Sequence, residues 1–110
     1  MKLVYFNLYA RGEPIRMLLW KVGVKFEDHR VSFEMWKAGD LKLSLPNKQM
    51  PVLVLDDGTT LSQAHAIMHF LSGQYGFSAS NPKDMYTGEH IYARWQEDFI
   101  LRVQFKIPSY

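Results

Sequence analysis

The sequence predicts an α/β protein in which helices cover a four-stranded mixed sheet. Two observations lead to this prediction. Apolar, β-branched runs alternate with segments of helical periodicity over the first half of the chain. Later, Asp57-Gly58 separates two short runs, a pattern typical of a β-hairpin. The expected order is β-α-β-α-β-β-α, then a linker and one further helix, and this order implies both parallel and antiparallel pairing.

The first predicted unit is a strand, a helix and a second strand. Lys2–Phe6 is apolar enough for a buried strand, and Lys25–Val31 is the second strand. The helix between them is Glu13–Val22. Pro14 suits its first turn, and Gly23 suits the left-handed residue after its end. The expected buried face of this helix consists of Ile15, Leu18, Leu19 and Val22.

A weaker helix is expected after the second strand. Ser32 can cap Phe33–Leu43, which Gly39 interrupts and Pro46 ends. The chain then returns to the sheet.

The hairpin and the helix after it complete the predicted sheet layer. Pro51–Leu55 and Thr59–Leu61 are the hairpin strands. Ser62 is a suitable N-cap for a helix over Gln63–Tyr75. The expected buried face of that helix includes Ala66, Ile67, Phe70 and Leu71.

A polar linker, Phe77–Pro82, precedes a last helix predicted over Met85–Phe105. That helix has an apolar stripe formed by Ile91, Trp95, Phe99 and Val103. Burying a large apolar side chain is worth about 1.5–3 kcal/mol, so we expect the stripe to be covered. A longer chain, a larger assembly or a second copy would each cover it, and the sequence does not choose among them.

The composition excludes several functional classes. The chain has 110 residues and a net charge of +2, which gives no argument for nucleic acid or an anionic membrane. No apolar run is long enough to span a membrane, and the N-terminus lacks the layout of a signal peptide, so we expect a cytosolic protein. There is no cysteine, which excludes disulfides and thiol chemistry by this chain. We expect no metal, because no ligand motif relates the four histidines, His29, His65, His69 and His90.

Short motifs recur in a fixed order along the chain. They are Tyr5-Phe6-Asn7, Arg11, Glu27-Asp28-His29-Arg30, Trp36, Lys42-Leu43-Ser44-Leu45-Pro46, Gln49-Met50-Pro51, Asp57-Gly58, Leu61-Ser62-Gln63 with Ala66-Ile67, and Glu97-Asp98-Phe99. In this order the chain resembles the N-terminal thioredoxin-like domain of a cytosolic glutathione transferase, most closely the sigma class. The resemblance implies a glutathione-binding βαβ-α-ββα domain over residues 1–76 and a linker over 77–82. Residues 83–110 would be the first helix of an incomplete helical domain.

The resemblance implies that glutathione is the co-substrate and that its thiolate attacks a hydrophobic electrophile. Tyr5 would be the catalytic residue, donating a hydrogen bond to the sulfur. A phenol has a pKa of about 10 and therefore keeps its proton at neutral pH. Lowering a thiol pKa from about 8.5 to about 6.5 needs roughly 3 kcal/mol of preferential thiolate stabilisation. The alternative is a core tyrosine packed by its ring.

Three further residues are assigned to the tripeptide by resemblance. Arg11 would hold the peptide near the thiol, although a solvated loop charge is the alternative. Trp36 and Lys42 would grip the glycyl end, through an indole N–H and a cation. The segment between Trp36 and Pro51 is two residues longer than expected. Counting back from Pro51 selects Lys42, whereas counting forward from Trp36 selects Asp40.

The Gln49-Met50-Pro51 loop corresponds to the loop whose proline is cis across the thioredoxin superfamily. The resemblance implies a cis Met50–Pro51 bond and a Met50 backbone that pairs with the peptide like an added strand. Gln63 and Ala64 occupy the helix start that binds the γ-glutamyl carboxylate. Ala64 replaces the usual serine, which removes one charge-assisted hydrogen bond worth about 1.5–3 kcal/mol.

Asp98 corresponds to an acidic residue that reaches glutathione on the other subunit of a dimer; a solvated helix charge is the alternative. Ala64 and the longer segment before Pro51 also allow a second function, a non-catalytic structural subunit of a larger assembly. A glutaredoxin-like redox function is excluded because the chain has no cysteine.

Overall fold

The computed structural model describes residues 1–100, in which four strands form one mixed sheet with the order β2-β1-β3-β4. The strands are β1 (Lys2–Phe6), β2 (Glu27–Val31), β3 (Val52–Val54) and β4 (Thr60–Ser62). β1 pairs parallel with β2 and antiparallel with β3, and β3 pairs antiparallel with β4. The predicted thioredoxin-like α/β fold is therefore confirmed.

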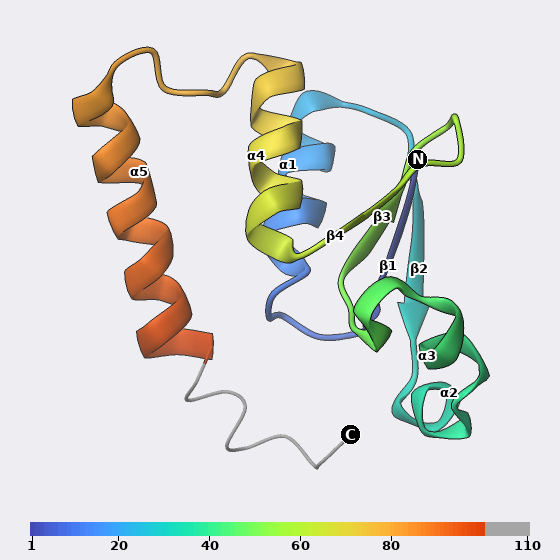
Figure 1. Cartoon of the computed structure of the whole chain (residues 1–110). Helices are drawn as coiled ribbons and strands as arrows, with labels where there is room; N and C mark the ends of the chain where they lie inside the picture. The colour runs from blue at the N-terminus through green and yellow to red at the C-terminus, as the bar shows by residue number, and fades with distance from the viewer. Residues whose placement is uncertain (101–110) are drawn as a thin grey trace.

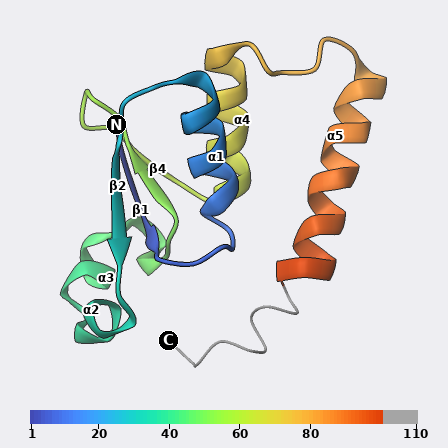
Figure 2. The same cartoon turned by 180° about the vertical axis from the view of Figure 1, so that it is seen from behind.

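The α-helices do not cover all sides of this sheet equally. They are α1 (Glu13–Val22), α2 (Phe33–Ala38), α3 (Asp40–Ser44), α4 (Ala64–Tyr75) and α5 (Pro82–Trp95). Figure 1 shows α1 and α4 side by side against the sheet, while α2 and α3 lie near the end of β2. Seen from behind in Figure 2, α5 stands beyond α4, away from the strands. None of the helices within residues 1–100 has the length and apolar character needed to cross a membrane.

The first strand is buried on both of its faces. Leu3 belongs to a cluster with α1 and α4, whereas Val4 belongs to a second cluster that includes Trp36 of α2. Strands buried on both faces read as continuous apolar runs, which explains why Lys2–Phe6 alternates poorly. The first cluster consists of Leu3, Ile15, Leu19, Leu53, Ala64, Ile67 and Leu71. The second consists of Val4, Tyr5, Phe6, Ala10, Val31, Trp36, Val52 and Ile100.

The expected start of α4 needs a correction. Ser62 ends β4 and does not cap the helix; Gln63 is the N-cap residue, and no side chain makes a capping hydrogen bond there. Gln63 has a φ of 72°, in the left-handed region that favours glycine. The chain therefore turns sharply between the sheet and α4.

The buried face of α4 also differs from the expected one. Ala64, Ile67 and Leu71 are buried, in agreement with the prediction for the last two. Ala66 and Phe70 are exposed, so the buried face of α4 lies on a different side of the helix from the predicted face. Ala64 packs into the first cluster from the first turn of α4, together with Ile67 and Leu71.

The last described helix begins earlier than expected. Asn81 caps α5 by accepting a hydrogen bond from the backbone N–H of Asp84 at 2.9 Å, which starts the helix at Pro82. The helix ends at Trp95 and continues as a π-helical turn over Gln96–Ile100. The remainder of the helix predicted to Phe105 lies outside the described residues.

The apolar stripe of this helix is only partly covered. Ile91 is 63% exposed and Phe99 is 46% exposed, whereas Trp95 packs partly against the second cluster. Ile100, which was not in the predicted stripe, is buried instead. Val103 lies outside the described residues.

A buried arginine ties the end of β1 to its neighbours. Arg16 of α1 is fully buried, although it was not part of the predicted apolar face. Its Nε donates to Asp28 Oδ1 at 2.8 Å, and its Nη2 donates to the Phe6 carbonyl at 2.9 Å. Its Nη1 donates to the Leu8 carbonyl and to Glu13, each at 3.3 Å. One side chain therefore joins α1, β2 and the loop after β1.

Replacing Arg16 tests this network. We expect Arg16→Leu to lower the free energy of unfolding by about 3–5 kcal/mol, because it leaves the Phe6 and Leu8 carbonyls without their donor and removes the buried one of the two arginines that bond Asp28. Urea unfolding followed by circular dichroism measures the change. Arg30→Leu is the matched control, since Arg30 bonds the same Asp28 at 2.9 Å from the exposed side and should contribute below about 1 kcal/mol. Equal losses in the two variants would contradict the role given to Arg16.

Candidate functional site

A cavity of about 480 Å³ lies at the carboxyl end of β1. Eight of the residues predicted to form the site line it: Tyr5, Arg11, Trp36, Lys42, Gln49, Met50, Pro51 and Gln63. The other lining residues are Phe6, Lys48, Ser62 and Gln96. Ala64 and Asp98 lie outside this lining among the residues that the structure describes.

Tyr5 is held by the loop that follows β1. The residue is 4% exposed, and its hydroxyl accepts a hydrogen bond from the backbone N–H of Arg11 at 3.1 Å. The guanidinium of Arg16 lies 5.7 Å from the centre of the Tyr5 ring. A hydroxyl that accepts a hydrogen bond uses a lone pair and is polarised as a donor. The geometry therefore suits a phenol that donates a hydrogen bond to a ligand atom while keeping its proton.

Gly12 leaves the space that the Tyr5 ring occupies. A Cβ at position 12 would lie 2.4 Å from Cδ2 and 2.5 Å from Cγ of Tyr5. Its φ of −84° is ordinary, so the glycine is required by space and not by backbone conformation. No sequence pattern pointed to this contact, because it joins the end of a strand to a loop.

The charged residues that line the cavity within the described part of the chain are all cations: Arg11, Lys42 and Lys48. Lys42 lies with its Nζ 5.7 Å from the centre of the Trp36 ring. Of the two candidates left open by counting, Lys42 reaches the cavity and Asp40 is not among its lining residues. This lining suits a ligand that carries carboxylates.

The loop before β3 meets the start of α4 at the cavity. The Met50–Pro51 peptide bond is cis, as expected. Gln63 Nε2 donates to Gln49 Oε1 at 3.4 Å, which joins the two segments. The first turn of α4 starts here with buried Ala64, and helix N-termini present backbone N–H groups to anions.

Asp98 is not one of the residues that line the cavity. It forms an ion pair with Arg94 at 2.7 Å, and its side chain is 47% exposed. Gln96, in the same π-helical turn, lines the cavity instead. Sequence patterns did not single out Gln96 or Lys48, because no motif marks their side chains, and they assigned Ser62 to a helix cap and not to the cavity.

The fold and this cavity define a class. Residues 1–73 match the family described as "Glutathione S-transferase, N-terminal domain". The mixed sheet, the cis proline and the tyrosine at the end of β1 are thus parts of a glutathione S-transferase N-terminal domain of thioredoxin-like fold.

Individual relatives agree with that class. The chain is 45% identical to "Glutathione S-transferase 2" of Caenorhabditis elegans over 83 residues, which cover 76% of this chain and 43% of the relative. It is 34% identical to "S-crystallin 4" of Enteroctopus dofleini over 79% of this chain and 40% of that protein. A solved glutathione S-transferase of Caenorhabditis elegans superposes with a TM-score of 0.81 at 34% identity, over 96% of this chain and 51% of that one. The chain belongs to the glutathione S-transferase family and spans about half, or less, of the length of these relatives.

Substitution at Gly12 tests the close contact with Tyr5. We expect Gly12→Ala to lower the free energy of unfolding by about 1–3 kcal/mol, because the new methyl group must displace the ring. Gly88→Ala is the matched control, since nothing lies within 4 Å of a Cβ built at position 88. Within α5 that change should stabilise the protein by about 0.5–1 kcal/mol. Thermal and urea unfolding measure both variants, and a neutral Gly12→Ala would show that the ring has room to move.

Proposed function

We propose that this chain binds glutathione in the cavity at the end of β1 and that Tyr5 stabilises the thiolate form of its sulfur. The thiolate then attacks a hydrophobic electrophile, in a conjugation or an isomerisation. The observation that carries this proposal is the convergence of Tyr5 with three cations around one cavity. Family membership supports the same ligand.

The glycyl end of the tripeptide is assigned to the side of α2 and α3. Lys42 supplies a cation to the glycyl carboxylate, and the Trp36 indole N–H supplies a neutral donor. Trp36 is 5% exposed and packs edge-on against Phe6, so its ring is held in one orientation. Arg11 holds the middle of the peptide close to Tyr5.

The γ-glutamyl end is assigned to the start of α4. The Gln63 side chain and the first N–H groups of the helix face the carboxylate, while the Met50 backbone pairs with the cysteinyl residue. Ala64 stands where the family has a serine hydroxyl, so this end is held by one hydrogen bond fewer. The expected consequence is an affinity roughly 10- to 150-fold weaker than with that hydroxyl.

The chemistry at Tyr5 follows from differential stabilisation. A hydrogen bond from a neutral phenol to a charged sulfur is stronger than one to a neutral thiol. About 3 kcal/mol of this preference lowers the thiol pKa by roughly two units. The hydroxyl keeps its proton throughout, and the electron pair that forms the new bond comes from the sulfur.

The proposal extends to the whole protein in several respects. In this proposal the protein is cytosolic and belongs to the sigma class. Residues 1–76 are the glutathione-binding domain, residues 77–82 are the linker, and residues 83–110 are the start of a helical domain. The protein acts as a homodimer in which Asp98 reaches the amine of glutathione on the other subunit. Partly exposed apolar residues of α5, Ile91 and Phe99, are consistent with packing against further protein.

A second candidate function is a non-catalytic structural subunit that retains the fold. Ala64 favours it, because the substitution weakens the binding of glutathione. The similarity to "S-crystallin 4" also supports it. Calorimetry with glutathione separates the two functions, because binding weaker than millimolar favours the structural subunit.

The role of Tyr5 is tested with Tyr5→Phe, which removes only the hydroxyl. We expect the rate of glutathione conjugation to an aryl halide to fall by about 100-fold, because roughly 3 kcal/mol of thiolate stabilisation is lost. Tyr9→Phe is the matched control, since Tyr9 is 77% exposed and should leave the rate unchanged. Thiolate absorbance of bound glutathione against pH reports the shift directly. Equal rates in both variants would refute the catalytic role of Tyr5.

The strained backbone at Gln63 gives a second test. We expect Gln63→Gly to raise the free energy of unfolding by up to about 1 kcal/mol, because glycine adopts a positive φ without strain. Glutathione should bind about tenfold more weakly, since one side-chain hydrogen bond is lost. Asn47→Gly is the matched control, with a φ of 56° at an exposed position outside the cavity lining. Its glutathione affinity should not change. Unchanged affinity in Gln63→Gly would remove this residue from the proposed site.

A further inference from the structure

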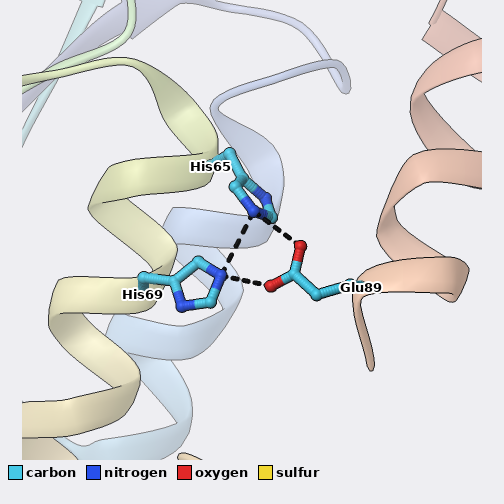
Figure 3. Close-up of side chains that lie close together, drawn as sticks. All are labelled: His65, His69 and Glu89. Atoms are coloured by element: carbon cyan, nitrogen blue, oxygen red, sulfur yellow. Dashed lines mark hydrogen bonds and ion pairs between the residues drawn. The ribbon is translucent and has the colours of Figure 1, made fainter. Parts of the chain in front are cut away.

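Two histidines and a glutamate meet in the space between α4 and α5. His65 and His69 are one helical turn apart on α4, and Glu89 reaches toward them from α5 (Figure 3). The two histidine Nε2 atoms are 3.1 Å apart, and His65 Nε2 lies 2.8 Å from Glu89 Oε2. His69 Nε2 contacts the other carboxylate oxygen. Their ligand atoms all lie within 4.8 Å of one another.

This convergence has the geometry of a metal site. Zinc–nitrogen bonds of about 2.0–2.1 Å in a tetrahedral site put two ligand nitrogens roughly 3.3 Å apart, close to the observed separation. A neutral imidazole coordinates through the lone pair of one ring nitrogen. If both Nε2 atoms are deprotonated, their lone pairs face each other and a cation between them removes the repulsion. The carboxylate of Glu89 supplies the negative charge that a dication needs.

The three side chains are accessible to an ion from the solvent. The side chains of His65, His69 and Glu89 are 42%, 58% and 47% exposed, at one end of a cavity of about 410 Å³ between the two helices. The ring of Tyr92 lies on His65, with centroids 4.4 Å apart.

We propose that His65, His69 and Glu89 bind one divalent transition-metal ion, for which zinc is the best fit. Two imidazoles and one carboxylate supply three of the four positions of a tetrahedral zinc site, and water completes it. Magnesium and calcium fit these ligands poorly, because both ions prefer oxygen atoms and two of the three ligand atoms are nitrogens. The bound ion links the first turns of α4 to the middle of α5, two elements on opposite sides of the linker.

This site is separate from the glutathione cavity. His65, His69 and Glu89 line the cavity between the helices and not the one beside Tyr5. No metal is expected from the sequence, because no ligand motif relates the four histidines, and Glu89 is 20 residues from His69. The third ligand becomes visible only when α5 is placed beside α4. The ion is therefore expected to act on the arrangement of the two helices.

Calorimetric titration of the whole 110-residue chain, freed of any affinity tag, with zinc chloride tests the proposal. We expect one zinc ion per chain, and a cobalt complex whose visible spectrum is that of a tetrahedral site with nitrogen and oxygen ligands. His69→Ala and Glu89→Gln should each weaken zinc binding by at least about tenfold. Zinc should also raise the midpoint of thermal unfolding of the unmodified chain but not that of His69→Ala.

His90→Ala is the matched control. His90 lies on α5 one residue after Glu89, where its ring stacks on Tyr86 and not on the cluster. This variant should bind zinc with the affinity of the unmodified chain. Absence of zinc binding, or equal binding by His69→Ala and His90→Ala, would overturn the proposal and leave a histidine–glutamate ion pair only. Glutathione affinity, measured in parallel, should be the same in all of these variants, so this outcome is distinguishable from a failure of the proposed function.

Discussion

The buried guanidinium of Arg16 is the interaction on which the rest of the structure depends. A charged group without water must have its hydrogen bonds supplied by the protein, and this one takes them from the end of β1, from β2 and from its own helix. The backbone after β1 is therefore fixed at the point where the chain leaves the sheet. Tyr5 precedes Phe6, whose carbonyl accepts one of these bonds. The position of the phenol at the cavity therefore depends on the buried arginine, whose guanidinium lies 5.7 Å from the centre of the Tyr5 ring.

Two loops close the cavity with different kinds of constraint. The loop after β1 is ordered by hydrogen bonds to Arg16 and by the contact of Arg11 N–H with Tyr5. The segment before α4 is ordered by a residue with unfavourable backbone angles, Gln63, which the neighbouring packing keeps in place. Both constraints place backbone N–H groups and side-chain donors toward one volume. A preformed arrangement of this kind reduces the entropy that these two loops lose when a ligand binds.

Much of the fold and of the cavity lining was predictable from the sequence, because local signals and motifs pointed to the same answer. The hairpin turn at Asp57-Gly58, the apolar run of β1 and the cis proline agreed with the structure. Arg16 was missed because hydrophobic periodicity counts only apolar residues. The start of α4 was misjudged because Ser62 has the chemistry of a cap but belongs to a strand. The cluster of His65, His69 and Glu89 depends on the placement of two helices, which no local pattern contains.

The contact between Gly12 and Tyr5 has a further consequence for α1. Gly12 is also the residue that begins this helix, and no side chain there accepts a hydrogen bond from the first turn. Serine, threonine or aspartate at such a position usually stabilises a helix by roughly a few tenths of a kcal/mol relative to glycine. Each of them carries a Cβ, and that atom would collide with the aromatic ring. The start of α1 is therefore less stable than one with a side-chain cap. In exchange, the missing Cβ leaves space for the ring of Tyr5.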